Sequence, residues 1–531
     1  MLVGLVSGCA RRTPPQAQVV RISQRNEPAD LDPATAALPD EFFIIRALGE
    51  GLLVPNPAGG PPLPGAAARY DVSSDGLRYT FHLRPDLRWS NGERVTASDF
   101  LTSWQRVLDP ATAAPKADLF RSVKNAAEFN AGRIADFRKV GFEAPDDRTI
   151  VVSLTHAQPD FPFYAASGPW IPVNPRVVAK FGRHWTEPAH YVGNGPFTLV
   201  EWRHEQRVVV QRNPAYHGAA RIRLDRIEFI RFDNQDTEER AFRAGQIEVT
   251  MAVPQTKLAV YGQEHPDELH RAALAETRFL AFNTTRPPLT DPRVRRALAL
   301  AIDRSKIVRD VLRGGQLPAH RFLSPALRTV PAEGMRREAS GAPRPEAAGD
   351  VGGLPHFDPV EARRLLAEAG YPNGAGFPRL EFAGWDRNPA LEAIQQMWRA
   401  ELGIEVRIVV QEARVHLAAL TAGNYDIAFV TNLLDIPSAR AALADFTTNA
   451  PNNFPHWHSG AFDRLLAAAA TEPRAASAAV LRHRAETLLL SDAAIAPIYF
   501  NVQNWLMSPR VHGWEQDALW QRRYNDLTVG K

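Results

Sequence analysis

The chain of 531 residues contains one cysteine, Cys9. A single thiol excludes an intramolecular disulfide framework, and it excludes zinc and iron–sulfur sites that are built from several thiolates. The core of a chain of this length should be large enough to need no disulfide or metal staple. Hydrophobic residues make up 45% of the chain and charged residues 23%, which is the usual balance for a globular protein. A chain of this length has room for roughly two to four domains.

The start of the chain resembles a bacterial lipoprotein signal. A short apolar run ends in Val6-Ser7-Gly8-Cys9, which is similar to the lipobox in which the cysteine becomes the lipidated first residue. We expect residues 1–20 to form a lipoprotein signal peptide and tether, with the protein in the periplasm or cell envelope. No Lys or Arg precedes the apolar run, so either the true start lies upstream or the match is due to chance. No segment approaches the ~20 apolar residues that span a bilayer.

Neither charge nor motifs indicate nucleic-acid binding or catalysis. Lys and Arg number 62 against 59 Asp and Glu, and the net charge of +3 is too small to argue for nucleic acid. The sequence has no G-x-S-x-G elbow and no phosphate loop that ends in Gly-Lys-Ser/Thr. His456 and His458 lack carboxylates at chelating spacing, so we expect no metal site and no cofactor.

Strand and helix patterns alternate irregularly along the chain, as in a mixed α/β protein. The alternation in LRYTFHL predicts a half-buried strand whose inward residues are Leu77, Tyr79, Phe81 and Leu83. Thr96, Asp291 and Asp358 are predicted to cap helices, and a proline directly follows each of the two aspartates. The helix after Asp358 is expected to end at Gly370 in a left-handed conformation.

Four segments, in order, resemble the family 5 extracellular solute-binding proteins that supply peptides to ABC importers. The first, YTFHLRPDLRWSNGERVTASDFLTSWQRVLDPATAAP at residues 79–115, has a strand, a Trp-Ser-x-Gly turn, a capped helix and an Asp-Pro exit. The others are FGRHWTEPAHYVGNGPFTLVEWRHEQRVVVQRNPAYHG, then ERAFRAGQIEVTMAVP with TRFLAFNTTRPPLTDPRVRRALALAIDRSKIV, and finally IAPIYFNVQNWLMSPRVHGW. Within the first segment, Trp89, Gly92 and Trp104 are expected to hold the turn and the helix rather than to touch a ligand.

The resemblance implies an α/β, two-lobed periplasmic-binding-protein-like fold of class II type, with an extra domain and with hinge strands between the lobes. Lobe I would combine residues 21–53, 190–273 and 496–531, the extra domain would span residues 54–189, and lobe II residues 274–495. Within lobe II, the loop at 324–357 is too long for an ordinary connection. We expect this loop to be a mobile lid or disordered, and we favour disorder.

The resemblance also implies a ligand contact at Asp435. Oligopeptide-binding members pair an aspartate with the peptide's N-terminal ammonium, shortly after a strand with the pattern Asp-hydrophobic-Ala, here Asp426-Ile427-Ala428. A desolvated ammonium requires a charged, hydrogen-bonded partner. The alternative is that Asp435 only caps a turn before Pro437.

The surroundings of Asp435 depart from the family pattern. Asn432, Leu433 and Leu434 stand where peptide binders usually have an aromatic residue and a cysteine. Lys116 replaces a tyrosine after the Asp-Pro exit and is able to meet a carboxylate. Trp385 follows a predicted strand, where either a pocket aromatic or a surface or core tryptophan is equally expected. The candidate ligand contacts are Asp435, Asn432, Leu433, Thr431, Trp385, Lys116, Leu38 and Met251.

The sequence therefore predicts a binding protein and not an enzyme. Its predicted function is to capture a short peptide between two lobes and to deliver it to a membrane permease, as a monomer held at the membrane by a lipid on Cys9. The same fold with a non-peptide solute, namely an oligosaccharide, a nickel chelate, an opine or haem, is the alternative. The third hypothesis is of a different class, namely a hydrolase or a signalling module that has lost transport.

Overall fold

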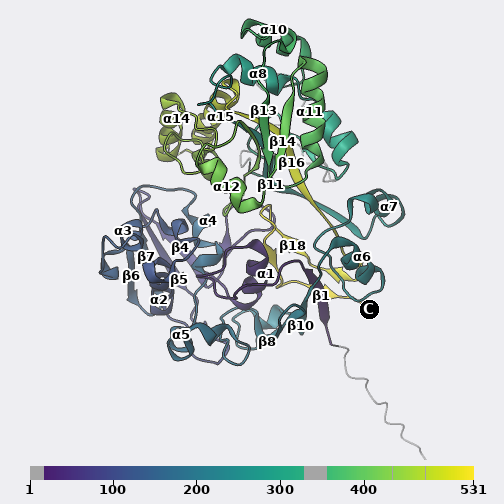
Figure 1. Cartoon of the computed structure of the whole chain (residues 1–531). Coiled ribbons are helices and arrows are strands. Elements are labelled where there is room, and N and C mark those ends of the chain that lie inside the picture. The colour runs from purple at the N-terminus through teal and green to yellow at the C-terminus, as the bar shows by residue number, and fades with distance from the viewer. Residues whose placement is uncertain (1–16, 328–355, 433, 473, 531) are drawn as a thin grey trace, which may run out of the picture.

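The computed structural model describes residues 17–327, 356–432, 434–472 and 474–530. Cys9 and most of the expected disordered loop, residues 328–355, lie outside the described residues. Figure 1 shows lobe II above lobe I and the extra domain, with two long strands running between them. Within the described part of the chain, no helix combines the length and the apolar character that crossing a membrane would need.

Lobe I is built on a four-stranded sheet with the order β1-β10-β9-β8. Its strands are β1 (Val19–Gln24), β8 (Phe197–Arg203), β9 (Arg207–Arg212) and β10 (Arg226–Arg231). The helices of this lobe are α1 (Pro39–Leu48), α6 (Gln235–Arg243) and α7 (Leu258–Glu264). Helix α1 packs into the same hydrophobic core as β1 and the C-terminal segment, because its apolar residues Ile44 and Leu48 are fully buried there.

The extra domain contains an antiparallel sheet with the order β4-β5-β7-β6. Its strands are β4 (Ala67–Val72), β5 (Arg78–Leu83), β6 (Phe142–Asp146) and β7 (Thr149–Ser153). Its helices are α2 (Ala97–Leu108), α3 (Ala126–Asn130), α4 (Phe161–Ala165) and α5 (Pro175–Phe181). The strand prediction is confirmed except at Leu77, which precedes β5 and is 36% exposed.

The two tryptophans of the first segment, Trp89 and Trp104, hold the turn and helix α2 in place. Trp89 is fully buried, and its Nε1 donates a hydrogen bond of 3.3 Å to Asp99 in the first turn of α2. Trp104 is also fully buried, lies 4.8 Å from the Trp170 ring and donates to the Trp170 carbonyl. The expectation that Trp89 and Trp104 hold the turn and the helix is confirmed.

Lobe II is built on a six-stranded sheet with the order β12-β16-β11-β15-β13-β14. Its strands are β11 (Leu269–Phe282), β12 (Leu317–Pro318), β13 (Leu380–Gly384), β14 (Val406–Val410), β15 (Ile427–Thr431) and β16 (Ile495–Leu506). Its helices are α8 (Pro292–Leu300), α9 (Arg304–Lys306), α10 (Pro359–Glu368), α11 (Pro389–Leu402), α12 (Ala413–Thr421), α13 (Ala439–Ala444), α14 (Gly460–Thr471) and α15 (Ala475–Ser491). Separate hydrophobic cores cover the two faces of the sheet, one with α8, α10 and α11 and the other with α13, α14 and α15 (Figure 1).

The hinge consists of β11 and β16, which pair with each other from Leu269↔Leu506 to Ala281↔Ile495. At the lobe I end, Met507 forms a bridge to Val249, which in turn bridges to β1. The pairing is interrupted between Ala273 and Thr277, and a bulge of this kind is a place where paired strands bend. The expected domain boundaries remain predictions, and the one at residues 273/274 falls at this interruption.

Helix ends follow the sequence signals. The Asp291 carboxylate accepts a hydrogen bond from the Arg293 backbone N–H, and Asp358 accepts one from Glu361. Gly370 has a φ of +98°, the left-handed conformation that favours glycine. These predictions are confirmed.

Candidate ligand-binding site

A cavity lies where lobe II meets lobe I and the extra domain. It consists of two adjoining hollows, of about 490 and about 550 Å³, which share Ser167, Asp435 and Gln521 and are partly open to solvent. We call this space the interlobe cavity. Its lining includes Ala37, Phe42, Phe43 and Arg46 from lobe I, Lys116, Leu119, Ser167 and Gly168 from the extra domain, Ala326, Leu434, Asp435 and Pro437 from lobe II, and Asp517, Ala518, Leu519 and Gln521 from the C-terminal segment.

Asp435 reaches this cavity because a buried strand ends just before it. In β15, residues 427–430 are all buried, whereas Thr431 at its end is half-buried. After this strand the chain turns, and the buried side chain of Ile436 anchors the turn. Ser438 then caps α13, where its hydroxyl accepts the Ala441 backbone N–H. The Asp435 side chain, 43% exposed, is therefore held on a short loop that is fixed at both ends.

Lys116 of the extra domain forms an ion pair with Asp435 of lobe II. Lys116 precedes a short 3-10 turn whose Leu119 and Phe120 side chains are buried in the core of the extra domain. The Lys116 side chain is 20% exposed, less than that of its partner. Burial, and then the nearby Asp435 carboxylate, raise the pKa of Asp118 above its ordinary value. The carboxylate of Asp435 is thus neutralised by a residue of the chain itself.

A second polar contact joins the same two units, and we call it the interlobe clamp. Arg440 donates hydrogen bonds of 3.0 and 3.1 Å to the carboxylate of Asp160, and the Ser438 hydroxyl donates one of 2.5 Å to the same group. The side chains of Asp160 and Arg440 are only 14% and 22% exposed. Because the carboxylate holds Arg440, the pKa of that guanidinium is raised even though burial acts to lower it. The clamp fixes lobe II against α4 of the extra domain.

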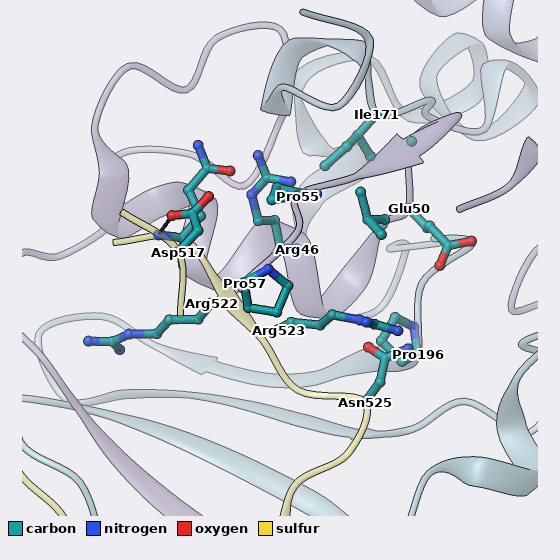
Figure 2. Close-up of a pocket in the computed structure, with 14 residues that line it drawn as sticks. Arg46, Glu50, Pro55, Pro57, Ile171, Pro196, Asp517, Arg522, Arg523 and Asn525 are labelled. Atoms are coloured by element: carbon teal, nitrogen blue, oxygen red, sulfur yellow. Dashed lines mark hydrogen bonds between the residues drawn. The ribbon is translucent and has the colours of Figure 1, made fainter. Parts of the chain in front are cut away.

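Arg46 brings a second cation to the interlobe cavity. Its two Nη atoms donate to the Ala166 carbonyl at 3.3 Å, whereas its Nε has no hydrogen-bond partner. Burial lowers the pKa of Arg46 to about 10, so the side chain stays charged at neutral pH. Figure 2 shows Arg46 and Asp517 at a third hollow, of about 510 Å³, which adjoins the interlobe cavity. Gln521 lines all three hollows, and its buried Oε1 accepts no hydrogen bond.

Asp517 is the other carboxylate of the cavity lining. It is buried, and its Oδ1 accepts the backbone N–H groups of Leu519 and Gln521 at 2.9 and 2.8 Å. Burial raises the pKa of Asp517 to about 6, although the charge of Arg46 acts in the opposite direction. Asp517 Oδ1 therefore stabilises the turn of the C-terminal segment, whereas the Asp435 carboxylate accepts no such bonds from the backbone of the described residues and faces the cavity.

Of the predicted ligand contacts, Asp435 and Lys116 are the two that the structure brings together in the interlobe cavity. Thr431 and Trp385 lie instead around a second polar cluster in lobe II. The Thr431 hydroxyl donates to Glu276 at 2.8 Å, and the Arg278 guanidinium lies 5.0 Å from the Trp385 ring centre. Trp385 directly follows β13 and is 36% exposed, so it stands at a strand end as predicted.

The remaining candidates lie elsewhere. Asn432 is buried, and its Oδ1 accepts the Thr277 backbone N–H, which ties β15 to β11. Met251 is also buried, and its Sδ contacts Arg522 Nη2 at 3.0 Å. Leu38 is 48% exposed and precedes α1. Leu433 lies outside the described residues. Ligand contact by any of these residues stays a prediction.

Sequence reasoning missed Arg46, Ser167, Asp517 and Gln521. A signal existed for Arg46, because it is the charged residue in an otherwise apolar run, FFIIRAL, of an α-helix. No comparable pattern surrounds the others, since Asp517 and Gln521 reach the cavity through the way the C-terminal segment folds back onto α1, and Ser167 through the packing of the extra domain. Among the described residues, no group of three or more His, Cys, Asp or Glu side chains is placed to hold a metal ion.

Comparison with known proteins gives one consistent family. The profile of the bacterial extracellular solute-binding proteins, family 5 Middle, matches residues 62–454. The chain is 32% identical to the periplasmic oligopeptide-binding protein OppA of Escherichia coli K12, over 92% of this chain and 88% of OppA. It is 31% identical to the probable deoxycholate-binding periplasmic protein YgiS of the same strain, over 93% of this chain and 90% of YgiS. The unliganded open form of the murein tripeptide binding protein MppA superposes with a TM-score of 0.81 at 28% identity, over 97% of this chain and 98% of MppA.

Proposed function

The chain belongs to the bacterial extracellular solute-binding proteins of family 5, and we propose that it captures short peptides in the interlobe cavity and delivers them to the membrane permease of an ABC importer. The observation that carries this proposal is the position of Asp435. It stands on a loop of lobe II and faces residues of lobe I and of the extra domain across one cavity. A ligand held there touches every unit of the protein, so its binding favours the closed arrangement.

The chemistry of the cavity suits a peptide. Gln521 and Arg46 line the cavity, and the buried Gln521 Oε1 and Arg46 Nε lack partners, so a small side-chain rotation would present an acceptor for a peptide N–H and a donor for a carbonyl or carboxylate. Phe42 and Phe43 of α1 supply apolar surface for a side chain. A buried polar group needs a partner, so these groups favour a ligand with alternating donors and acceptors, which a peptide backbone provides. The names of OppA and MppA agree with this ligand class. No bond is made or broken in this function.

Titration with defined peptide pools tests the proposal. A pool of random tripeptides is expected to raise the melting temperature, because a ligand that binds only the native state stabilises it in proportion to RT ln(1 + [L]/Kd). Small-angle scattering of the same samples is expected to show compaction. Mass spectrometry of the protein under native conditions would then identify the peptides retained. If no peptide pool shifts the melting temperature or is retained, peptide capture is refuted.

A non-peptide solute is the second candidate function, and one observation favours it. Lys116 already neutralises Asp435, so the cavity is not reserved for a ligand cation. The similarity to YgiS, which is named as a probable deoxycholate-binding protein, is consistent with a neutral or anionic solute. Titration with deoxycholate beside the tripeptide pool separates the two candidates, because only one of them is expected to shift the melting temperature.

We propose that the protein works outside the cytoplasm as a monomer, tethered to the membrane by a lipid on Cys9. The names of OppA, YgiS and MppA all describe these relatives as periplasmic proteins. The Cys9→Ser variant tests the tether, because loss of the lipid is expected to move the protein from the membrane fraction to the soluble fraction. Retention of the variant in the membrane fraction would contradict lipidation at Cys9.

A further inference from the structure

The ion pair between Lys116 and Asp435 determines which chemical groups the interlobe cavity can accept. Asp435 is the cavity carboxylate that is exposed enough to meet a ligand, since Asp517 is buried and bonded to backbone N–H groups. Lys116 forms an ion pair with it. A ligand ammonium at this place would have to displace Lys116 or stand beside it, and two ammonium groups at one carboxylate repel each other.

The groups that stay available in the cavity are complementary to an amide. A lysine ammonium has three N–H donors, and the bond to Asp435 uses one of them. The others can donate to a carbonyl oxygen near Asp435. Gln521 and Arg46 line the cavity, and Gln521 Oε1 and Arg46 Nε are buried without a partner, so a small rotation of these side chains would present an acceptor for an amide N–H and a donor for its carbonyl. A free ammonium at Asp435 is repelled by the Lys116 ammonium. An acylated nitrogen can instead donate its N–H to Gln521, and its carbonyl can accept from Lys116.

We propose that the interlobe cavity selects peptides whose N-terminus is acylated and discriminates against peptides with a free N-terminal ammonium, because Lys116 takes the ammonium's place at Asp435. This inference rests on the proposed function of peptide capture and specifies its ligand class. The side-chain ammonium of Lys116 thereby turns a carboxylate that would attract a cation into a neutral pair that accepts an amide.

Matched peptide pools test the inference. A random tripeptide pool and its N-acetylated twin are titrated against the wild-type protein, Lys116→Met and Lys139→Met, with isothermal calorimetry and native mass spectrometry. Methionine keeps the length of the lysine stem and removes its charge. Lys139 is an exposed lysine of the same domain that does not line the cavity, so its variant is the matched control. The melting temperature of each variant, without ligand, establishes that it is folded.

The wild-type protein and Lys139→Met are expected to bind the acetylated pool at least tenfold more tightly than the free pool. Lys116→Met leaves Asp435 unpaired, and the ratio is expected to shift by tenfold or more toward free peptides, which corresponds to about 1.4 kcal/mol. Adding Asp435→Asn to Lys116→Met is expected to abolish this gain for free peptides, and this double variant serves if the single one does not fold.

Two results would overturn the inference. If the wild-type protein binds free peptides as tightly as acetylated ones, or if Lys116→Met leaves the ratio unchanged, acyl selection is wrong while peptide capture stands. If neither pool binds to the wild-type protein, peptide capture and the inference fail together. The two failures are therefore distinguishable.

Discussion

Removing Arg440 should show how much the interlobe clamp contributes to closure. The Arg440 guanidinium donates to both oxygens of Asp160, with N–O distances of 3.0 to 3.1 Å, and it also lies 3.4 Å from the Tyr164 hydroxyl. Both charged side chains are largely buried in the interface between lobe II and the extra domain. The Arg440→Ala variant leaves the Asp160 carboxylate with the Ser438 hydroxyl as its remaining partner across the interface.

The size of the effect follows from burial. Exposed ion pairs contribute about 0–1 kcal/mol, and truncation of one partner of a fully buried pair costs about 3–5 kcal/mol. With 14% and 22% of its side chains exposed, this pair lies between these limits, so we expect a cost of about 2 kcal/mol to the closed arrangement. This cost lowers the closed-to-open ratio by roughly 30-fold. A ligand that binds only the closed form loses affinity by up to that factor.

Scattering and calorimetry measure this cost. The ligand-free Arg440→Ala protein is expected to have a larger radius of gyration than the wild type, and its ligand affinity is expected to fall by about 10- to 30-fold. The control is Arg474→Ala, because Arg474 is 80% exposed and pairs with Glu472 within lobe II. An unchanged radius together with an unchanged dissociation constant would refute the reasoning that the clamp holds the lobes together.

Two further predictions concern stability. The pKa of Asp517 is raised to about 6 from an ordinary value of 3.8, so the folded state binds the proton more tightly and stability falls as pH rises from about 4 to about 6, by at most about 3 kcal/mol. Asp517→Asn keeps the Oδ1 acceptor for the Leu519 and Gln521 N–H groups. This variant is expected to flatten the fall of the melting temperature with pH. Parallel pH profiles of the variant and the wild type would contradict the prediction. Trp104→Ala empties the fully buried site against Trp170 and is expected to destabilise the extra domain by about 3–5 kcal/mol, as measured by denaturant unfolding; a loss below about 1 kcal/mol would mean that the site collapses around the cavity.

Local structure could be predicted from the sequence because its causes are local. The helix after Asp291 begins there because the aspartate side chain accepts a backbone N–H and Pro292 fits the first turn. The helix that follows Asp358 ends at Gly370 because a positive φ favours glycine. The strand predicted from LRYTFHL begins at Arg78 and not at Leu77.

The site could be predicted only in part, because it is assembled from distant segments. Asp435 and Lys116 are separated by 319 residues. Asp435 was singled out because it stands where the family has its anchoring aspartate, and Lys116 because it replaces a tyrosine of the family pattern. That the two side chains meet depends on how the extra domain packs against lobe II, which no local pattern encodes. Asn432 was predicted as a ligand contact because it lies near Asp435 in the sequence. Its side-chain oxygen instead accepts the Thr277 backbone N–H of β11.

One short stretch of lobe II, the loop with Asp435 and the start of α13, carries both the cavity carboxylate and the interlobe clamp. Asp435 faces the interlobe cavity, and Ser438 and Arg440 a few residues later form the clamp with Asp160. The clamp lies outside the interlobe cavity, at a hollow of about 720 Å³ lined by Asp160, Ser438 and Arg440. Movements that bring Arg440 to Asp160 therefore also bring Asp435 to Lys116.

This arrangement separates two kinds of variant. Because the clamp does not line the interlobe cavity, Arg440→Ala should weaken the binding of free and acetylated peptides by the same factor. The ratio of the two affinities should therefore stay unchanged. The carboxylate of the Lys116 ion pair is 43% exposed, whereas that of the clamp is 14% exposed, and Lys116 lines the interlobe cavity; Lys116→Met should therefore change the ratio with little effect on the radius of gyration of the ligand-free protein. A change of ratio in the Arg440 variant would mean that closure itself reshapes the cavity around Asp435, and selectivity would then belong to the geometry of the loop rather than to the charge of Lys116.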